Sequence, residues 1–260
     1  MNIVVLIKQV PDTWSERTLS DGDKTLDRAS SDAVLDEINE RAVEEALKIK
    51  EADGAEVTIL TAGPDRATDA IRKALSMGAD KAVHVNDDAI HGSDAVATAK
   101  VLAKAIGTVG DVDLVIAGNE ATDGRSGAMA GMIGEVLGWP SLTHANQLSV
   151  GDGSATVKRV TDEGTCDVTA SLPAVVSVAE KINEPRYPSF KGIMAAKKKP
   201  VNTLGVADLG LDASEVGLAG SLVAVDSFAP RPPKSGGQKV EDEGDGGAKI
   251  AEFLVGQKLI

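Results

Sequence analysis

Cysteine and aromatic residues are both scarce in this chain of 260 residues. It contains two Trp, one Tyr and three Phe, so its core must be built from Ala, Val, Leu and Ile. The single cysteine, Cys166, excludes a disulfide framework and a cluster of thiolate metal ligands, and it suits a reducing compartment. Because Cys166 falls in a strand-like pattern, we expect it to be buried. No apolar run approaches the roughly 18 residues that a membrane-spanning helix requires.

Familiar catalytic motifs are absent as well. The sequence has no G-x-S-x-G and no H-E-x-x-H pattern, and its three histidines lack the spacing of metal ligands. We expect His84 to be packed in the core and His91 and His144 to lie in loops. The neighbouring carboxylates of Glu44 and Glu45 are expected to be solvated on a polar helix face. The chain is therefore predicted to bind a ligand or carry electrons, with no catalytic residues of its own and no metal.

Acidic residues outnumber basic ones, at 40 Asp and Glu against 27 Lys and Arg, which gives a net charge of −13. Such a balance argues against general nucleic-acid binding and against binding to an anionic membrane surface. The apolar run near the N-terminus, residues 3–7, is too short for a signal peptide and is typical of a first buried strand. We therefore expect a cytoplasmic protein with one large domain, or one domain and an appendage.

Strands and helices alternate over the first 140 residues. Apolar strands are predicted at 3–8, 57–60, 82–85 and 113–117, and helices at 37–51, 65–77, 94–106 and 127–137. Asp36 and Ser93 are the expected N-caps of the first and third of these helices. Repeated βα units predict an α/β fold, in which a mostly parallel sheet carries helices on both faces.

The pattern changes after Pro140. Short strands at 148–150, 155–160, 166–171 and 174–178 are joined by Gly and Asp turns, so this part of the sheet is expected to be partly antiparallel. From residue 228 the chain is rich in Pro and Gly, and an acidic stretch precedes a short apolar helix at 250–259. We therefore divide the chain into a domain over 1–227 and a C-terminal arm over 228–260.

Three predicted loops leave the carboxyl ends of strands, where open parallel sheets bind ligands: 8–12, 61–65 and 118–126. The third places Gly124, Gly127 and Gly131 before and inside a helix start, and Arg125 would add positive charge. Glycines let the backbone approach a phosphate, but they equally allow close packing of a helix on a sheet, and both readings stay open. The loop is neither G-x-G-x-x-G nor G-x-x-x-x-G-K-[ST]. The Ser-Gly-Gly at Ser235 lies too far from the first strand to be a phosphate loop.

The segment over residues 183–199 differs from an ordinary solvated loop. It holds apolar and aromatic residues, namely Tyr187, Phe190, Ile193 and Met194, beside the four lysines Lys191, Lys197, Lys198 and Lys199. In an acidic chain this combination indicates a surface that recognises another protein. The alternative is a loop folded back on its own core.

The stretch LPAVVSVAEKINEPRYPSFKGIMAAKKK closely resembles the signature of the electron transfer flavoprotein beta subunit, the FixA-like family. The resemblance extends in order to VVLIKQVPD, INERAVEEALKIKEA, LTAGP, IRKALSMGADKAVHV, DLVIAGNEATDGRSG and GEVLGWP. It covers nearly the whole chain and is greatest for the actinobacterial branch.

This resemblance implies a Rossmann-like domain, of the adenine nucleotide alpha hydrolase-like kind, in a heterodimer. The alpha subunit would hold the redox-active FAD, and this subunit would bury AMP as a structural element. The complex would accept electrons from acyl-CoA and related dehydrogenases of fatty acid oxidation and pass them towards a membrane quinone oxidoreductase. The arm over 228–260 would dock on the alpha subunit.

Residues are carried over by position from the family's motifs. The nucleotide contacts would be Leu6, Asp36, Glu37, Ile38, Asn39, Ala62, Gly118, Asp123, Gly124, Arg125, Ser126, Gly127, Ala128, Met129, Ala130, Gly131 and Gly134. The partner contacts, with Phe190 as the apolar anchor, would be Glu184, Pro185, Arg186, Tyr187, Phe190, Ile193, Met194 and Lys197.

The chain departs from the family's pattern at three places. Relatives read N-P-x-D where this chain has residues 36–39, and DGDT-x-QVGP where it has 123–131, so Arg125 would offset phosphate charge in place of the usual polar contacts. Trp14 stands where relatives have a Tyr near the flavin. Two alternatives remain: an electron-bifurcating variant with a second FAD in this subunit, oxidising NADH, and a stand-alone nucleotide-binding protein of the universal-stress type.

Overall fold

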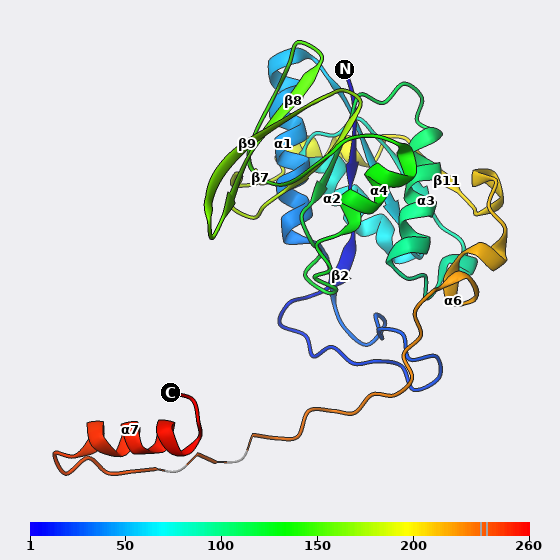
Figure 1. Ribbon diagram of the computed structural model, residues 1–260. Helices are drawn as coiled ribbons and strands as arrows, with labels where there is room; N and C mark the ends of the chain where they lie inside the picture. Colours follow the sequence, from blue (N-terminus) through cyan, green and yellow to red (C-terminus); the bar gives the residue numbers. More distant parts are fainter. Residues whose placement is uncertain (235, 238) are drawn as a thin grey trace. The chain divides into compact units, whose positions relative to one another are not determined.

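The computed structural model describes residues 1–234, 236–237 and 239–260 (Figure 1). The chain forms two units, Met1–Asp226 and Ser227–Ile260, whose boundary lies one residue from the predicted one. Ser235, in the Ser-Gly-Gly stretch, lies outside the described residues.

Within the described part of the first unit, nine strands form one sheet in the order β11-β5-β4-β1-β6-β10-β7-β8-β9. Strands β11 to β7 in this order are parallel to one another, whereas β8 and β9 are antiparallel additions. A short antiparallel pair, β2 and β3, stands apart from the sheet. The strands are β1 Asn2–Leu6, β2 Gln9–Pro11, β3 Ala33–Leu35, β4 Glu56–Ala62, β5 Lys81–Val85, β6 Leu114–Gly118, β7 Ser141–Gly151, β8 Ser154–Thr161, β9 Gly164–Ser171, β10 Ala174–Val178 and β11 Val201–Leu204.

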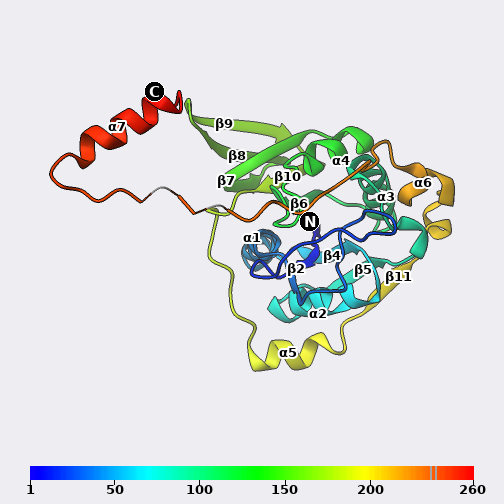
Figure 2. The ribbon, with the colours of Figure 1, turned by 90° about the horizontal axis from the view of Figure 1, so that it is seen from below.

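Helices cover both faces of the parallel sheet, as predicted. Helices α1 (Glu37–Asp53) and α2 (Thr68–Met77) lie on one face, and α3 (Ala95–Gly107) and α4 (Met129–Leu137) on the other (Figure 2). Two further helices, α5 (Phe190–Ala196) and α6 (Gly217–Gly220), follow the last parallel strands, and η1 (Asp65–Ala67), η2 (Asp88–Ile90), η3 (Ala207–Leu209) and η4 (Ala213–Glu215) are short 3₁₀ turns. The fold is therefore the predicted α/β architecture.

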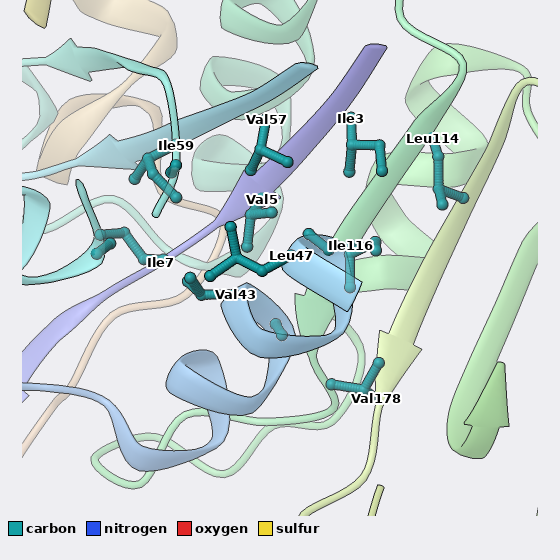
Figure 3. Packing of buried hydrophobic residues seen from close by; sticks show 14 of the residues in the cluster. Ile3, Val5, Ile7, Val43, Leu47, Val57, Ile59, Leu114, Ile116 and Val178 are labelled. Atoms are coloured by element: carbon teal, nitrogen blue, oxygen red, sulfur yellow. The ribbon is translucent and has the colours of Figure 1, made fainter. Parts of the chain in front are cut away.

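Successive residues of the central strands point to opposite faces and enter two separate cores. Ile3 and Val5 of β1 pack with Val43 and Leu47 of α1 (Figure 3). Val4 belongs instead to the cluster under α3 and α4. Both clusters are aliphatic, as the shortage of aromatic residues requires. A strand buried on both faces reads as a continuous apolar run, which is why β1 was visible in the sequence.

Three helix starts differ from the prediction. Helix α2 begins at Thr68 rather than at residue 65, because residues 65–67 form the 3₁₀ turn η1. Asp94, not Ser93, caps α3, because its Oδ1 accepts a hydrogen bond from the backbone N–H of Ala97 at 2.8 Å. The Ser93 hydroxyl instead donates to the carbonyl of Ile90. Helix α4 begins at Met129 rather than at Gly127, because Gly127 has a φ of 65° and a left-handed residue does not open a right-handed helix.

Three expectations about the later strands are wrong. Strand β7 is 11 residues long rather than three, and it includes His144, which was expected in a loop and has a left-handed φ of 58°. Cys166 is exposed instead of buried, because β9 is an edge strand that pairs only with β8 and its first half is uncovered. His84, by contrast, is buried as predicted.

The second unit contains one helix, α7, among its described residues. It spans Gly246–Gly256 rather than 250–259. Its large apolar side chains, including Ile250, Phe253 and Val255, are exposed within this unit. In the described residues of the whole chain, every helix is too short or too polar to traverse a lipid bilayer.

Candidate functional site

The three predicted ligand loops meet at one edge of the sheet. Strand β1 lies between β4 and β6, and the chain runs from β1 towards β4 and β5 before it returns through α3 to β6. The strand order therefore reverses between β1 and β6. Such a switch point leaves a crevice at the carboxyl ends of the strands, and open α/β sheets bind their ligands there.

Asp36 fastens the start of α1 to the third loop. Its side chain is fully buried; Oδ1 accepts hydrogen bonds from the N–H groups of Ile38 and Asn39, and Oδ2 accepts one from Thr122 at 2.7 Å. The predicted cap is thus confirmed and has a second partner 86 residues away. Opposite, a Cβ on Gly118 would stand 2.5 Å from Nδ2 of the Asn39 side chain and 3.2 Å from the carbonyl oxygen of Glu120, so a larger residue would displace Asn39 from this position.

Asp123 lies at the centre of an ion cluster. Its side chain is 1% exposed, and its oxygens lie 2.9 Å from Lys8 Nζ and 2.7 Å from Arg28 Nη2. Burial alone would raise the pKa of Asp123, but the charges and hydrogen bonds of Lys8 and Arg28 outweigh it and lower the pKa. The buried Asp123 side chain therefore stays an ionised carboxylate at neutral pH.

Residues 12–32, here named the cover segment, lie over the same loop. Strands β2 and β3 bring the ends of this segment together. Arg28 reaches Asp123, and Arg17 Nη1 donates to the carbonyl of Thr122 at 2.9 Å. Farther out, His91 Nε2 lies 2.6 Å from an oxygen of Asp23. Our sequence analysis missed Lys8, Arg17 and Arg28; basic residues that follow the first strand of an acidic chain were the available signal.

Several buried polar atoms around the switch point have no hydrogen-bond partner among the described residues. They are Thr122 Oγ1, Asn119 Oδ1, Arg28 Nη1 and Ser31 Oγ. Asp123 Oδ2 also lacks a well-formed hydrogen bond, although it lies 2.7 Å from Arg28 Nη2 as an ion pair. Proteins seldom leave buried polar groups unpaired. A nucleotide fits this set, because its phosphate accepts from a guanidinium and from hydroxyls while its base and ribose provide donors and acceptors.

The glycine-rich loop divides into an open part and a packed part. A Cβ on Gly124 or Gly131 would meet no atom within 4 Å, and one on Gly127 would have its nearest neighbour at 3.9 Å. A Cβ on Gly134, however, would stand 3.0 Å from Ser141 Cβ and from the carbonyl of Trp139. Gly134 therefore serves helix–sheet packing, whereas the preceding glycines leave space for a ligand.

The other predicted nucleotide residues lie near the switch point in different ways. Leu6 is the last residue of β1, and Ala62 is the last residue of β4. The side chains of Leu6 and Ala130 point into the core, so Leu6 and Ala130 would each offer a ligand mainly their backbone. Arg125 is exposed and lies 3.8 Å from Glu120. Glu37 is exposed, while Ser126, Ala128 and Met129 lead into α4. Their contacts with a nucleotide stay predictions.

The docking segment, defined as residues 183–199, exposes its apolar side chains. Tyr187 is 97% exposed and Phe190 81%, and Ile193 and Met194 are about half exposed. The alternative of a loop folded back on its own core is therefore wrong for these residues. The segment also contains a helix that the sequence analysis missed, α5, which packs against α2.

Gly192 sets how closely α5 approaches α2. A Cβ at this position would stand 2.4 Å from the carbonyl oxygen of Ser76. The other members of the predicted partner surface, Glu184, Pro185 and Lys197, lie on the same segment, and Lys197 borders a groove of about 530 Å³ between α2 and α5. Arg186 is different, because it pairs with Glu44 and Glu51 of α1. Glu44 and Glu45, expected to be solvated, are buried.

The fold is an α/β domain with a mostly parallel sheet, and its polar switch point is the kind of place where such sheets bind ligands. In the part of the chain that the structure describes, no group of His, Cys, Asp and Glu side chains could hold a metal ion.

Comparison with known proteins narrows this class. A family model described as "Electron transfer flavoprotein domain" matches residues 23–209. The electron transfer flavoprotein subunit beta of Mycobacterium tuberculosis (strain ATCC 25618 / H37Rv) is 62% identical over 264 residues, covering 100% of this chain and 99% of that protein. The protein of the same name from Megasphaera elsdenii is 34% identical, with 100% of both chains covered. The caffeyl-CoA reductase-Etf complex subunit CarD of Acetobacterium woodii is 36% identical over 92% of each chain.

This chain belongs to the electron transfer flavoprotein beta subunit family. The resemblance that the sequence motifs indicated is thereby confirmed, and with it the association with a flavin and with an alpha subunit that membership of the family implies.

Proposed function

We propose that this chain is the beta subunit of a heterodimeric electron transfer flavoprotein that carries electrons and has no catalytic residues of its own. The observation that carries this proposal is the docking segment, where Tyr187 and Phe190 are almost fully exposed. Large apolar side chains on a surface are typical of sites that recognise another protein. The visiting proteins would be acyl-CoA and related dehydrogenases of fatty acid oxidation, and a membrane quinone oxidoreductase would accept the electrons.

The alpha subunit would hold most of the FAD, which supplies the redox chemistry of the complex. Two features of this chain support the contact with that subunit. Trp14, within the cover segment, is 95% exposed, which suits an aromatic residue near a flavin held by the partner. In the second unit, the exposed apolar residues of α7 have no core of their own, which supports docking of the arm over 228–260 on the alpha subunit.

AMP would occupy the switch point as a structural element. Its phosphate would be held by Arg28 and by the backbone of the loop before α4, whose N-terminus has no side-chain cap among the described residues. Thr122 and Asn119 would bond the remaining polar groups of the nucleotide. The cover segment would exclude water from it. The exposed, free thiol of Cys166 suits a reducing compartment, which supports the proposed cytoplasmic location.

Mass spectrometry of the small molecules released by denaturing the purified heterodimer tests this proposal. We expect one AMP and one FAD for each heterodimer. Two FAD molecules and no AMP would instead support the bifurcating variant that oxidises NADH. A homodimer without flavin would overturn the proposal in favour of the stand-alone nucleotide-binding protein.

A further inference from the structure

Arg186, which was expected to contact partner proteins, is fully engaged within its own chain. Its backbone N–H donates to Glu44 Oε2 at 3.1 Å, its Nε to the same oxygen at 2.8 Å, and its Nη2 to Glu44 Oε1 at 3.0 Å. Nη2 also donates to Glu51 Oε2 at 3.1 Å, and Nη1 pairs with Glu51 Oε1. All three guanidinium nitrogens are therefore bound to two carboxylates of α1. Such forked pairs fix orientation as well as distance.

Burial makes this pairing obligatory for Glu44. The Glu44 side chain is only 7% exposed, and a buried carboxylate is costly unless it is paired and hydrogen-bonded. The hydrogen bonds with Glu51 and then Glu44 raise the pKa of Arg186, and the hydrogen bond from Arg186 lowers the pKa of Glu51. Arg186 and Glu51 therefore stay ionised over the whole neutral range.

Asn183 adds a second fastening one turn earlier on α1. Its Nδ2 donates to the carbonyl of Arg41 at 3.0 Å and to Glu45 Oε2 at 2.9 Å, while Arg41 donates to the carbonyl of Asn183. Contacts from positions 41, 44, 45 and 51 of the helix thus hold the beginning of the docking segment along one side of α1.

The end of the docking segment is fastened to α2. Arg72 Nη1 donates to the carbonyls of Ala196 and Lys199 at 2.7 and 3.0 Å. Lys199 Nζ in turn donates to the carbonyl of Leu75, in the last turn of α2, and to the carbonyl of Ala79, just after the helix. The exposed residues 187–194 therefore lie between two fixed ends, and Tyr187 follows Arg186 directly in the chain.

We propose that Arg186 is a positioning residue, which fixes the docking segment on α1 so that Tyr187 and Phe190 are presented in one arrangement. Its contact is with Glu44 and Glu51 and not with the visiting dehydrogenase. This inference rests on the proposed docking function. Ordering the segment before binding removes an entropic cost from association, so loss of the clamp would weaken docking without slowing electron transfer inside the docked complex.

The test compares four variants of the purified heterodimer: Arg186→Ala, Arg186→Lys, Phe190→Ala as a reference and Lys100→Ala as a control on the distant exposed face of α3. The donor is an acyl-CoA dehydrogenase that reduces the unmodified heterodimer, and the readouts are KM, kcat and amide hydrogen exchange of residues 187–196. We expect Arg186→Ala to raise KM about ten-fold while kcat changes less than about two-fold. Amide hydrogen exchange in residues 187–196 should become faster, whereas the exchange rates of β1 and α3 should not change.

Arg186→Lys keeps the charge and loses the fork, so it should restore little of the lost affinity. Glu51→Gln is the milder variant if Arg186→Ala does not fold, because it spares the buried pair with Glu44; it should change KM and exchange in the same direction by a smaller factor. Lys100→Ala should match the unmodified protein.

Two results would overturn the inference. A raised KM with unchanged exchange in 187–196 would make Arg186 a direct contact, and an unchanged KM with unchanged exchange would remove the clamp altogether. The reference variant separates this inference from the function on which it rests. If Phe190→Ala keeps the unmodified KM, the docking proposal fails, whereas a raised KM in Phe190→Ala alone rejects only the role of Arg186.

Discussion

The switch-point site and the docking segment both break the rule that charged residues are exposed and apolar residues are buried, but they do so in opposite ways. The first buries charged groups, with Asp36 and the side chain of Asp123 almost inaccessible to water. The second leaves Tyr187 and Phe190 almost fully exposed. Each departure costs free energy in the isolated chain, through desolvated polar groups in one case and solvated apolar area in the other. Both are tolerated where a ligand or a partner completes the surface.

Both regions are fastened to the same helix. Asp36 caps α1 and holds the third loop, while Glu44 and Glu51, farther along the helix, hold the docking segment. Helix α1 therefore gives a buried site and an exposed surface a common rigid support. Under the proposed function the two regions differ in what they would contact: a small polar molecule at the switch point, and an apolar protein surface at the docking segment.

The largest effect is expected for a substitution at Gly127, which tests the buried switch-point site. Its φ of 65° favours glycine, so Gly127→Val should cost about 3 kcal/mol of stability and prevent nucleotide binding. The measurements are urea unfolding and the AMP content of the purified heterodimer. Gly54→Val is the matched control, because Gly54 has a similar φ of 73° at the C-terminal end of α1 and a Cβ there meets no atom within 4 Å; it should lose stability but keep its AMP. Full AMP content in Gly127→Val would remove the third loop from the site.

Phe190→Ala addresses the exposed side. Removing this 81% exposed ring should leave unfolding and AMP content unchanged and weaken docking of the donor dehydrogenase by about 2 kcal/mol. Steady-state reduction of the heterodimer at varied concentration measures the effect as a rise in KM. Val136→Ala, an exposed apolar position on α4, is the control for lost surface area. Equal rates for Phe190→Ala and the unmodified protein would contradict the docking role of this residue.

Asp123→Asn tests how much the buried ion pairs of the switch-point site contribute to stability. It leaves Lys8 and Arg28 without their carboxylate and should cost about 2 kcal/mol at pH 7, below the 3–5 kcal/mol of fully buried pairs because both cations reach solvent.

The pH dependence of this effect has a definite sign. The pKa of Asp123 is lower in the folded state than its ordinary value of 3.8. Its contribution is therefore fully present above pH 3.8 and is lost as the pH falls through the folded-state pKa. Urea unfolding at pH 7 and at low pH should show the gap between Asp123→Asn and the unmodified protein closing on acidification. A gap that does not depend on pH would refute the ionic account, and exposed Asp162→Asn is the control.

The smallest effect is expected for Gly192→Ala. The added Cβ would lie 2.4 Å from the carbonyl oxygen of Ser76, so α5 must move away from α2. We expect a loss of about 1 kcal/mol and faster hydrogen exchange in α5. Gly107→Ala, at the end of α3, adds the same methyl group where nothing lies within 4 Å. Identical exchange in the two variants would show that the contact between α5 and α2 does not position the docking segment.

Much of the fold was predictable because its signals are local. The parallel strands β1, β4, β5, β6 and β10 and the four covering helices were each found within a few residues, since a strand buried on both faces is continuously apolar and an amphipathic helix repeats every three to four residues. The failures lie towards the two ends of the sheet: β11 was not predicted, β7 was predicted only in part, and β9 was wrongly expected to bury Cys166. There β7 and β9 expose one face or both, so their sequences carry no comparable run of apolar residues.

The candidate site was only half predictable. The sequence placed three loops at strand ends, and the topology brought them together. The sequence did not reveal that Lys8 and Arg28 pair with Asp123, nor that Glu44 is buried under Arg186. A charged residue on a polar helix face looks solvated unless the segment that covers it is known.

The sequence by itself determined the alternating α/β order, the aliphatic core, the glycine loop after β6 and the family. Each of these follows from residues close together in the chain, through apolar periodicity, side-chain volume or a contiguous motif. Only the tertiary structure decided which charges are paired and which apolar groups stay exposed. The bond between Lys8 and Asp123 joins residues 115 positions apart, and that between Glu44 and Arg186 joins residues 142 positions apart. Burial and pairing at such separations depend on how the strands are ordered in the sheet, and local preference carries no information about that order.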